Sequence, residues 1–196
     1  MIEQLPFSPP QLQNYMDACW FEGYFSPEEV RQISAVYDAT EKKLAETTKE
    51  GDVELDFRKS TVAFMKPTEE AHRPFMVKLA QLAIQANQQY FNFDLMGFYE
   101  PIQIAEYGAG DFFKWHADFG NGPESVRKLS LSIQLSDAAD YEGGDLQFMV
   151  NEEGVSAPRT LGTVVIFPSF VLHRVTPITS GKRRSLVGWV SGAPYR

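Results

Sequence analysis

Hydrophobic residues in the first third of the chain recur at helical spacing. Residues 26–29, Ser-Pro-Glu-Glu, have the character of an N-cap followed by a proline and an acidic first turn. They open a predicted amphipathic helix whose apolar positions are Val30, Ile33, Tyr37 and Leu44. After a strand predicted at 57–65, a second helix is predicted from the apolar positions Phe75, Leu79, Leu82, Ala86 and Tyr90.

From about residue 95 onward, the hydrophobic period shortens to two residues. Short runs are separated by Gly, Pro, Asn and Asp, and strands are predicted at 102–107, 112–118, 128–135, 145–150, 163–167, 172–175 and 185–190. The run 128–135 alternates strictly, so its small polar face would line a wet cavity. Helices followed by many short strands predict a mainly β fold, a jelly roll or barrel buttressed by the N-terminal helices.

Length and charge limit the possible organisation and partners. A chain of 196 residues with 43% hydrophobic content can bury one core but is short for two full domains. We expect a single domain over 1–196, with helical support over about 1–94 and a β core over about 95–192. The net charge of -8 disfavours nucleic acid as a partner, although a local basic pocket for one small anion remains compatible with it. No pattern indicates an oligomeric state.

The location expected for this chain is the cytoplasm. Cys19 is the only cysteine, so no intramolecular disulfide can form, which fits a reducing compartment. The start MIEQLPFSPPQ lacks the basic and apolar regions of a signal peptide. No stretch approaches the roughly twenty apolar residues that cross a bilayer, so no association with membranes is expected.

Two of the three histidines lie in the predicted β region and suggest a metal site. His116 and Asp118 form an H-x-D pair, and residues i and i+2 of a strand point to the same face. His173, on another predicted strand, is the remaining histidine of that half. Two imidazoles and one carboxylate occupy one face of an octahedron and leave three open positions, as in non-haem Fe(II) oxygenases. The alternative is a hydrogen-bonded pair at a strand end and an unrelated packing histidine.

An arginine ten residues after His173 indicates an anion site. Arg183 and Ser185 lie at i and i+2, so they share one strand face with Val187. An arginine inside a barrel is costly unless it meets an anion, and its planar fork suits a carboxylate such as the distal one of 2-oxoglutarate. The alternative, that the arginines here are ordinary surface cations near a turn, is the better interpretation for Arg184.

Several sequence blocks in the same half of the chain, together with these residues, resemble a known family. The blocks are 107–110 (YGAG), the H-x-D pair, 141–148 (YEGGDLQF), 162–168 (GTVVIFP), 173–177 (HRVTP) and the run from Arg183 to Trp189. In this order they resemble the 2-oxoglutarate and Fe(II)-dependent oxygenases, in particular the prolyl 4-hydroxylase-like branch. The resemblance covers about residues 102–191, nearly half of the chain.

The resemblance implies a double-stranded β-helix, or jelly roll, that binds Fe(II), 2-oxoglutarate and O2. It further implies ascorbate as a reductant. The implied iron ligands and catalytic residues are His116, Asp118 and His173. Arg183 and Ser185 would bind the C5 carboxylate of 2-oxoglutarate, and Tyr107 would lie near this cosubstrate.

The implied reaction is hydroxylation of an unactivated C–H bond, with release of succinate and CO2. Asp118 favours hydroxylation over halogenation, because related halogenases have a small residue at the carboxylate position. The expected partners are 2-oxoglutarate and an unidentified substrate, either a peptide or a small molecule, with a prolyl or another amino-acid residue as the hydroxylated group. The loops 119–126 and 151–160 and the segment 45–60 are predicted to form the lid that selects it.

Two other classes of protein would also use these residues. A cupin-type zinc or manganese enzyme, an isomerase or hydrolase, binds its metal through similar ligands. A non-catalytic jelly-roll binding module would keep the histidines as structural residues. Arg183 and Tyr107 argue against the cupin-type enzyme, because it has no need of a 2-oxo acid site.

Overall fold

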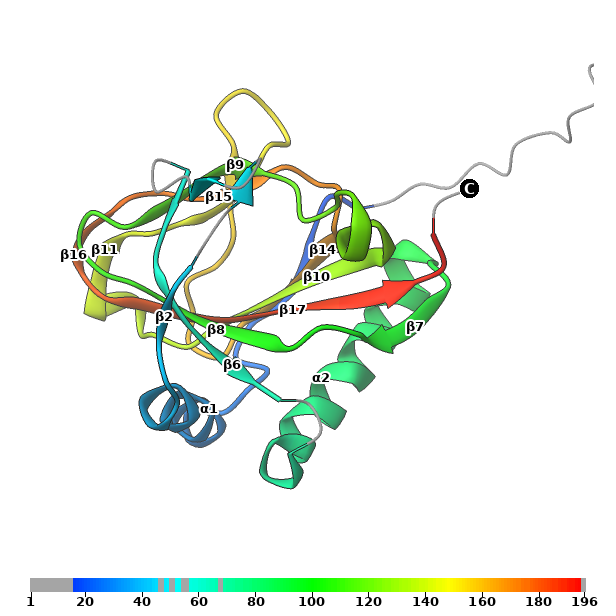
Figure 1. Ribbon diagram of the computed structural model, residues 1–196, viewed down its shortest axis with the longest axis horizontal. Helices are drawn as coiled ribbons and strands as arrows, with labels where there is room; N and C mark the ends of the chain where they lie inside the picture. Colours follow the sequence, from blue (N-terminus) through cyan, green and yellow to red (C-terminus); the bar gives the residue numbers. More distant parts are fainter. Residues whose placement is uncertain (1–15, 46–47, 50–51, 54–56, 67–68, 195–196) are drawn as a thin grey trace, which may run out of the picture.

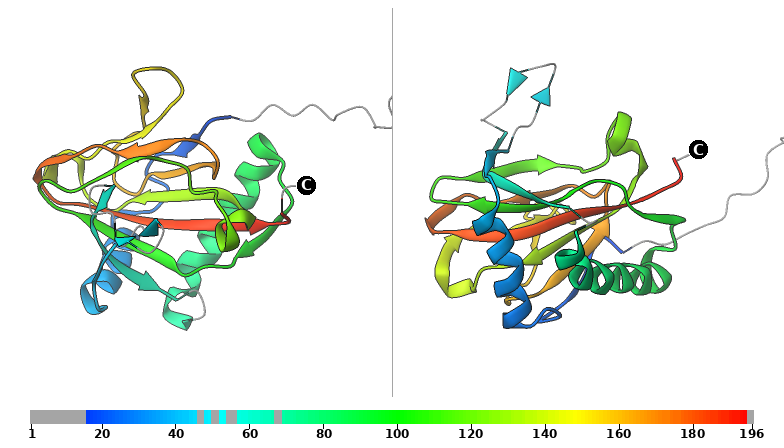
Figure 2. Two further views of the ribbon diagram at one scale, coloured as in Figure 1. Left: turned by 45° about the horizontal axis from the view of Figure 1, so that its top comes forward. Right: turned by 60° about the horizontal axis from the view of Figure 1, so that its bottom comes forward.

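The computed structural model describes residues 16–45, 48–49, 52–53, 57–66 and 69–194. In this part of the chain, helices α1 (Pro27–Ala39) and α2 (Arg73–Ala86) lie on the same side of a pair of packed antiparallel sheets (Figures 1 and 2). The predicted mainly β fold, a jelly roll with N-terminal helices, is confirmed. Neither of these helices is long and apolar enough to span a membrane.

The larger sheet has the strand order β1-β14-β10-β17-β8-β6-β2, and β7 also pairs with β17. Its strands are β1 (Cys19–Phe21), β2 (Lys43–Leu44), β6 (Thr61–Met65), β7 (Leu95–Phe98), β8 (Ile102–Tyr107), β10 (Arg127–Gln134), β14 (Val164–Pro168) and β17 (Arg183–Gly192).

The smaller sheet has the order β13-β12-β15-β9-β5. Its strands are β5 (Arg58–Lys59), β9 (Phe112–His116), β12 (Leu146–Phe148), β13 (Val155–Ser156) and β15 (His173–Val175). Two further pairs are β11 (Tyr141–Gly143) with β16 (Ile178–Gly181) and β3 (Thr48–Lys49) with β4 (Asp52–Val53). Short helical turns are η1 (Glu70–His72), η2 (Asn87–Phe91), η3 (Gly122–Val126) and η4 (Ala138–Asp140).

Helix α1 begins with the predicted cap. Ser26 Oγ accepts a hydrogen bond from the Glu29 N–H at 3.3 Å, and the Glu29 carboxylate accepts one from the Ser26 N–H at 2.8 Å. The helix ends at Ala39, where Thr40 becomes extended and its hydroxyl donates back to the Val36 carbonyl. The predicted inclusion of Leu44 in this helix is therefore wrong, since Leu44 lies exposed in β2.

The strand predicted at 57–65 is divided at Ser60 between the two sheets. Its first part, β5, pairs with β9, and its second part, β6, pairs with β8. The chain thus crosses from the smaller to the larger sheet at this point. One consequence is that Arg58 lies beside β9, which carries His116.

The two faces of the larger sheet have different roles. One face packs against α1 and α2 in the main hydrophobic core, to which β17 contributes Leu186 and Val190. Alternate residues of β17, among them Arg183 and Ser185, line a cavity between the larger and the smaller sheet. The strict alternation of β17 therefore separates a dry core from a polar cavity.

Candidate active site

Three potential metal ligands meet where β9 and β15 lie side by side. His116 is the last residue of β9 and pairs across the sheet with His173, the first residue of β15. Asp118 lies two residues beyond the end of β9. Its Oδ1 is 3.7 Å from His116 Nε2, and its Oδ2 is 3.5 Å from His173 Nε2. One ligand atom from each residue lies within 4.8 Å of the other two.

Both imidazole rings are oriented by a contact between Nδ1 and a backbone carbonyl oxygen. His116 Nδ1 lies 2.8 Å from the Lys114 carbonyl oxygen, and His173 Nδ1 lies 3.0 Å from the Val171 carbonyl oxygen. If each Nδ1–H donates to its carbonyl, each Nε2 keeps its lone pair and faces the Asp118 carboxylate. Two such nitrogens and one carboxylate form a donor set that fits Fe(II).

Asp118 is fixed through its side chain and its backbone. Ser130 Oγ of β10 donates to Asp118 Oδ2 at 2.6 Å. The Asp118 N–H donates to the Ser169 carbonyl at 2.9 Å, and Arg127 Nη1 donates to the Asp118 carbonyl at 3.0 Å. Asp118 is thus held in place although it lies outside a strand.

Electrostatics keeps these groups in the forms that bind metals. Burial and the neighbouring His173 together lower the pKa of His116 to about 4, although Asp118 opposes this shift. Burial raises the pKa of Asp118, but the two histidines and the Ser130 hydrogen bond lower it, and the net direction is downward. At neutral pH His116 is therefore neutral and Asp118 is charged.

Two expectations about strand geometry at this site are wrong. The strand predicted at 112–118 ends at His116, so Asp118 does not share a regular strand with it. The alternation of a regular strand predicts that Phe113, three residues from His116, points to the opposite face, yet its ring stacks on His116 at 3.5 Å and lines the cavity. The reason is a shift in register: Phe113 and His116 are three residues apart but pair with Val175 and His173, which are two apart. This irregularity brings both rings to one face.

The predicted anion site lies in the same cavity. Arg183 is 3% exposed and pairs across the larger sheet with Tyr107. Its Nη1 donates to Ser185 Oγ at 3.3 Å, and its guanidinium carbon lies 5.9 Å from the centre of the Tyr107 ring. The structure thus brings all the predicted site residues around one cavity of about 50 Å³, namely Tyr107, His116, Asp118, His173, Arg183 and Ser185.

Arg183 has no carboxylate partner among the residues that the structure describes, so its charge is available to a ligand. Gly144 leaves room for its side chain, since a Cβ there would lie 3.1 Å from Arg183 Cδ.

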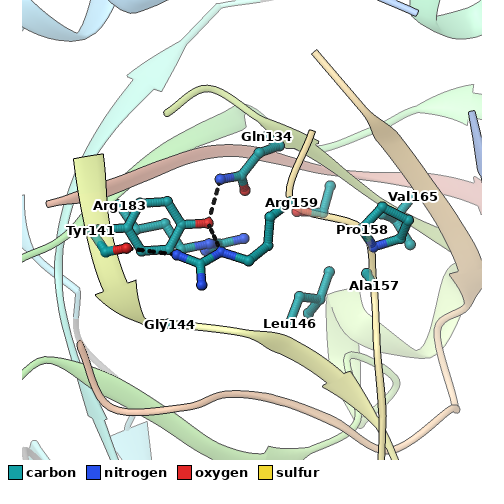
Figure 3. A pocket seen from close by; sticks show the side chains of 10 residues that line it. Gln134, Tyr141, Gly144, Leu146, Ala157, Pro158, Arg159, Val165 and Arg183 are labelled. Atoms are coloured by element: carbon teal, nitrogen blue, oxygen red, sulfur yellow. Dashed lines mark hydrogen bonds between the residues drawn. The ribbon is translucent and has the colours of Figure 1, made fainter. Parts of the chain in front are cut away.

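Arg183 also borders a second, smaller pocket (Figure 3). There Gln134 Nε2 and Arg159 Nε donate to the Tyr141 hydroxyl at 2.7 and 3.2 Å. These three hydrogen-bonded side chains line the smaller pocket together with Arg183.

Arg184, predicted to be a surface cation, lies outside the cavity. Its Nη2 is 2.6 Å from Glu106 Oε2 and 3.0 Å from Asp38 Oδ1. The guanidinium also packs on Tyr37 at 4.2 Å, so Arg184 connects α1 with the larger sheet.

Among the predicted lid segments, 119–126 contains η3, and 151–160 forms the loop that projects near β9 and β15 in Figure 1. Parts of the segment 45–60, residues 46–47, 50–51 and 54–56, lie outside the described residues.

Comparisons with known proteins agree with this fold and site. The family model of the 2OG-Fe(II) oxygenase superfamily matches residues 102–191. A PKHD-type hydroxylase of Shewanella oneidensis is 31% identical over 185 residues, which cover 92% of this chain and 71% of the relative. One of Synechococcus sp. (strain CC9902) is 36% identical over 99 residues, or 50% of this chain and 45% of the relative.

Solved structures give the same fold. A Pseudomonas putida prolyl-4-hydroxylase superposes with a TM-score of 0.71 at 23% identity, covering 90% of this chain and 93% of the other. A Trichoplax adhaerens prolyl hydroxylase, in complex with a peptide fragment of hypoxia inducible factor, has a TM-score of 0.70 at 18% identity, covering 90% and 84%.

The jelly roll and its two-histidine, one-carboxylate cluster define the class of non-haem iron oxygenase folds. The chain belongs to the 2OG-Fe(II) oxygenase superfamily, with PKHD-type hydroxylases among its relatives, and it has the fold of the prolyl hydroxylase structures. This family uses Fe(II), 2-oxoglutarate and O2, the cofactors expected from the sequence. The chain spans less than half the length of the first curated relatives that it matches.

Proposed function

We propose that this protein is a 2-oxoglutarate-dependent dioxygenase that hydroxylates an unactivated C–H bond. The observation that carries the proposal is the shared cavity. Its wall holds the two histidines and the Asp118 carboxylate, and it also holds Arg183, which pairs with no carboxylate among the described residues. A metal site alone would fit a cupin-type zinc or manganese enzyme. A buried arginine facing the same cavity adds the need for an anionic cosubstrate.

Each residue has a distinct task in this proposal. His116, Asp118 and His173 would hold Fe(II), and a set of three protein ligands would leave coordination positions for the cosubstrate and O2. Arg183, with Ser185 beside it, binds the C5 carboxylate of 2-oxoglutarate and fixes the orientation of this molecule toward the metal. Tyr107 packs along the cosubstrate.

Fe(II), when bound, supplies the activation of O2 and the oxidative decarboxylation of the 2-oxo acid. One oxygen atom enters succinate and the other enters the substrate, so that the C–H compound, 2-oxoglutarate and O2 become the alcohol, succinate and CO2. The carboxylate of Asp118 would serve as the third protein ligand, which favours hydroxylation over transfer of a halide. The protein itself determines which C–H bond reaches the open side.

The proposed substrate class is an amino-acid residue or a free amino acid, with proline as the first candidate. Relatives are named PKHD-type hydroxylases, and one structural neighbour is a prolyl hydroxylase bound to a peptide. The predicted lid segments 119–126 and 151–160 flank the strands that carry the metal cluster and would contact such a substrate. The cytoplasmic location stays a prediction.

The test is succinate formation from 2-oxoglutarate in the presence of Fe(II) and O2, since slow turnover without substrate suffices. We expect succinate with the wild-type protein and none above background with His116→Ala. If Zn(II) or Mn(II) stimulated turnover of a candidate substrate and no 2-oxoglutarate were consumed, the cupin-type enzyme would be supported instead. Absence of succinate formation with and without candidate substrates would contradict the proposal.

A further inference from the structure

Arg58 lines the cavity close to the metal cluster, and the reaction proposed above does not use it. It is half-buried in β5, beside β9. Its guanidinium carbon lies 4.7 Å from the centre of the Phe113 ring. The same ring stacks on His116 at 3.5 Å, so Phe113 contacts both Arg58 and a candidate metal ligand.

The contacts of Arg58 leave its terminal nitrogens available. Its Nε donates to Ser60 Oγ at 3.0 Å. Within the described part of the chain, no carboxylate pairs with this guanidinium, although the chain contains 26 acidic and 18 basic residues. A nearby acid, Asp111, pairs with Lys59 at 3.1 Å and accepts a hydrogen bond from the Gly108 N–H at 2.9 Å. The free edge of Arg58 is the two-nitrogen fork that matches a carboxylate.

With metal and 2-oxoglutarate bound, the cavity would keep an excess of positive charge, which favours binding of a further anion. A divalent metal together with Arg58 and Arg183 carries four positive charges, against the single negative charge of Asp118. Bound 2-oxoglutarate, as a dianion, neutralises two of the remaining three. A positive charge in a partly enclosed site is costly without a counter-charge. An anionic group on the substrate would supply it.

We propose that Arg58 is a specificity-determining residue that binds a carboxylate of the substrate. The hydroxylated molecule is then either an amino acid with its free carboxylate or a peptide with an acidic residue next to the hydroxylated position. Both sources offer the same chemistry to the fork of Arg58. This inference rests on the function proposed above, because it assumes that the substrate enters the same cavity.

The experiment compares probes that differ only in the carboxylate. Succinate formation is measured with the common L-amino acids and their amides. It is also measured with acetylated and amidated tripeptides Ala-X-Glu and Ala-X-Gln, where X is each common amino acid. We expect at least one acid to stimulate turnover at an apparent KM roughly tenfold or more below that of its amide. A response to amino acids identifies the free carboxylate, and a response to Ala-X-Glu identifies the acidic peptide.

Variants assign this preference to Arg58. Arg58→Gln should remove the tenfold difference between acid and amide, and Arg58→Lys should restore part of it. Both variants should keep the affinity for 2-oxoglutarate within about twofold of wild type. Lys59→Gln is the matched control, since it removes one positive charge from the same strand but lies in an exposed ion pair with Asp111. It should keep the full preference.

Several outcomes would overturn the assignment. They are equal stimulation by acids and amides, no stimulation by any carboxylate probe, or an unchanged preference in Arg58→Gln. Loss of 2-oxoglutarate affinity in Arg58→Gln would also overturn it, because Arg58 would then serve only to press Phe113 against His116. The proposed function fails separately, when the wild-type protein forms no succinate at all.

Discussion

The metal end and the anion end of the cavity are built in different ways. Arg183 and Ser185 are the first and third residues of β17, a strand of ten residues whose register with β8 is uninterrupted from Arg183 to Val187. His116 and His173 instead lie at the ends of short strands, where the pairing shifts register, and Asp118 lies beyond its strand. The sheet as a whole thus positions the anion end, whereas individual hydrogen bonds position the metal end.

This difference predicts how each end responds to substitution. At the anion end, the backbone is held by many ladder hydrogen bonds, so only a change in the groups that touch the anion should matter. At the metal end, the ligand Asp118 depends on a few neighbours, among them Ser130 and Arg127. Substitution of such neighbours should therefore lower the affinity for the metal as well.

The largest expected effect is a loss of Fe(II) affinity that occurs on substitution at the metal end and not at the anion end. Asp118→Ala removes one of three ligands and should weaken Fe(II) binding by roughly a hundredfold or more, on the scale of a lost charged ligand. Arg183→Gln should leave the affinity for Fe(II) within about twofold, because it removes no ligand. Anaerobic titration of the metal, without 2-oxoglutarate, measures both. Similar losses in the two variants would mean that the ends are not independent.

The second prediction concerns the anion end. Arg183→Gln should weaken 2-oxoglutarate binding roughly a hundredfold, or about 3 kcal/mol, as expected when one partner of a buried charge-assisted hydrogen-bonded pair is removed. Arg184→Gln is the matched control, since this neighbouring guanidinium binds Glu106 and Asp38 outside the cavity. Calorimetric titration with 2-oxoglutarate in the presence of metal distinguishes them. An unchanged affinity in Arg183→Gln would refute the role of Arg183.

The sequence predicts the anion end better than the metal end for the same structural reason. Period-two alternation places Arg183 and Ser185 on one face of β17, and this is the face that lines the cavity. At the metal end, the same rule wrongly turns Phe113 away and extends the strand to Asp118. A register shift depends on how two strands pair, and no local pattern in either strand indicates it.

Two other residues show what local patterns leave out. Ser130 was recognised only as part of a polar strand face, because its bond to Asp118 joins segments that the fold brings together. Arg58 was not recognised, because its strand divides at Ser60 and only pairing with β9 brings it to the cavity. Blocks of family resemblance located the cluster itself, whereas these neighbours became apparent only in three dimensions.

The third prediction uses Ser130 to sharpen the comparison. Ser130→Ala removes the 2.6 Å hydrogen bond to Asp118 Oδ2 and should weaken metal binding roughly tenfold, as for other groups that orient a ligand. Ser132→Ala, two residues further along the same face of β10, provides the control and should change metal affinity less than twofold. If both variants bound Fe(II) as wild type does, local hydrogen bonds would not be what positions the metal end.

The smallest expected effect concerns the stability of the metal-free protein at acidic pH. The pKa of His116 is about 4 in the folded protein, against 6.5 for an ordinary histidine. Between these values the unfolded state binds the proton and the folded state does not, so the free energy of unfolding falls as the pH falls from 6.5 toward 4.

We expect a loss on the order of 1 kcal/mol between pH 7 and pH 5, measured by urea unfolding in the presence of a chelator. His116→Asn should remove most of this loss, because asparagine does not titrate. Arg183→Gln should keep it, since this substitution leaves His116 and its buried surroundings unchanged. An equally steep loss in His116→Asn would place the titrating group elsewhere and remove the electrostatic part of the contrast between the two ends.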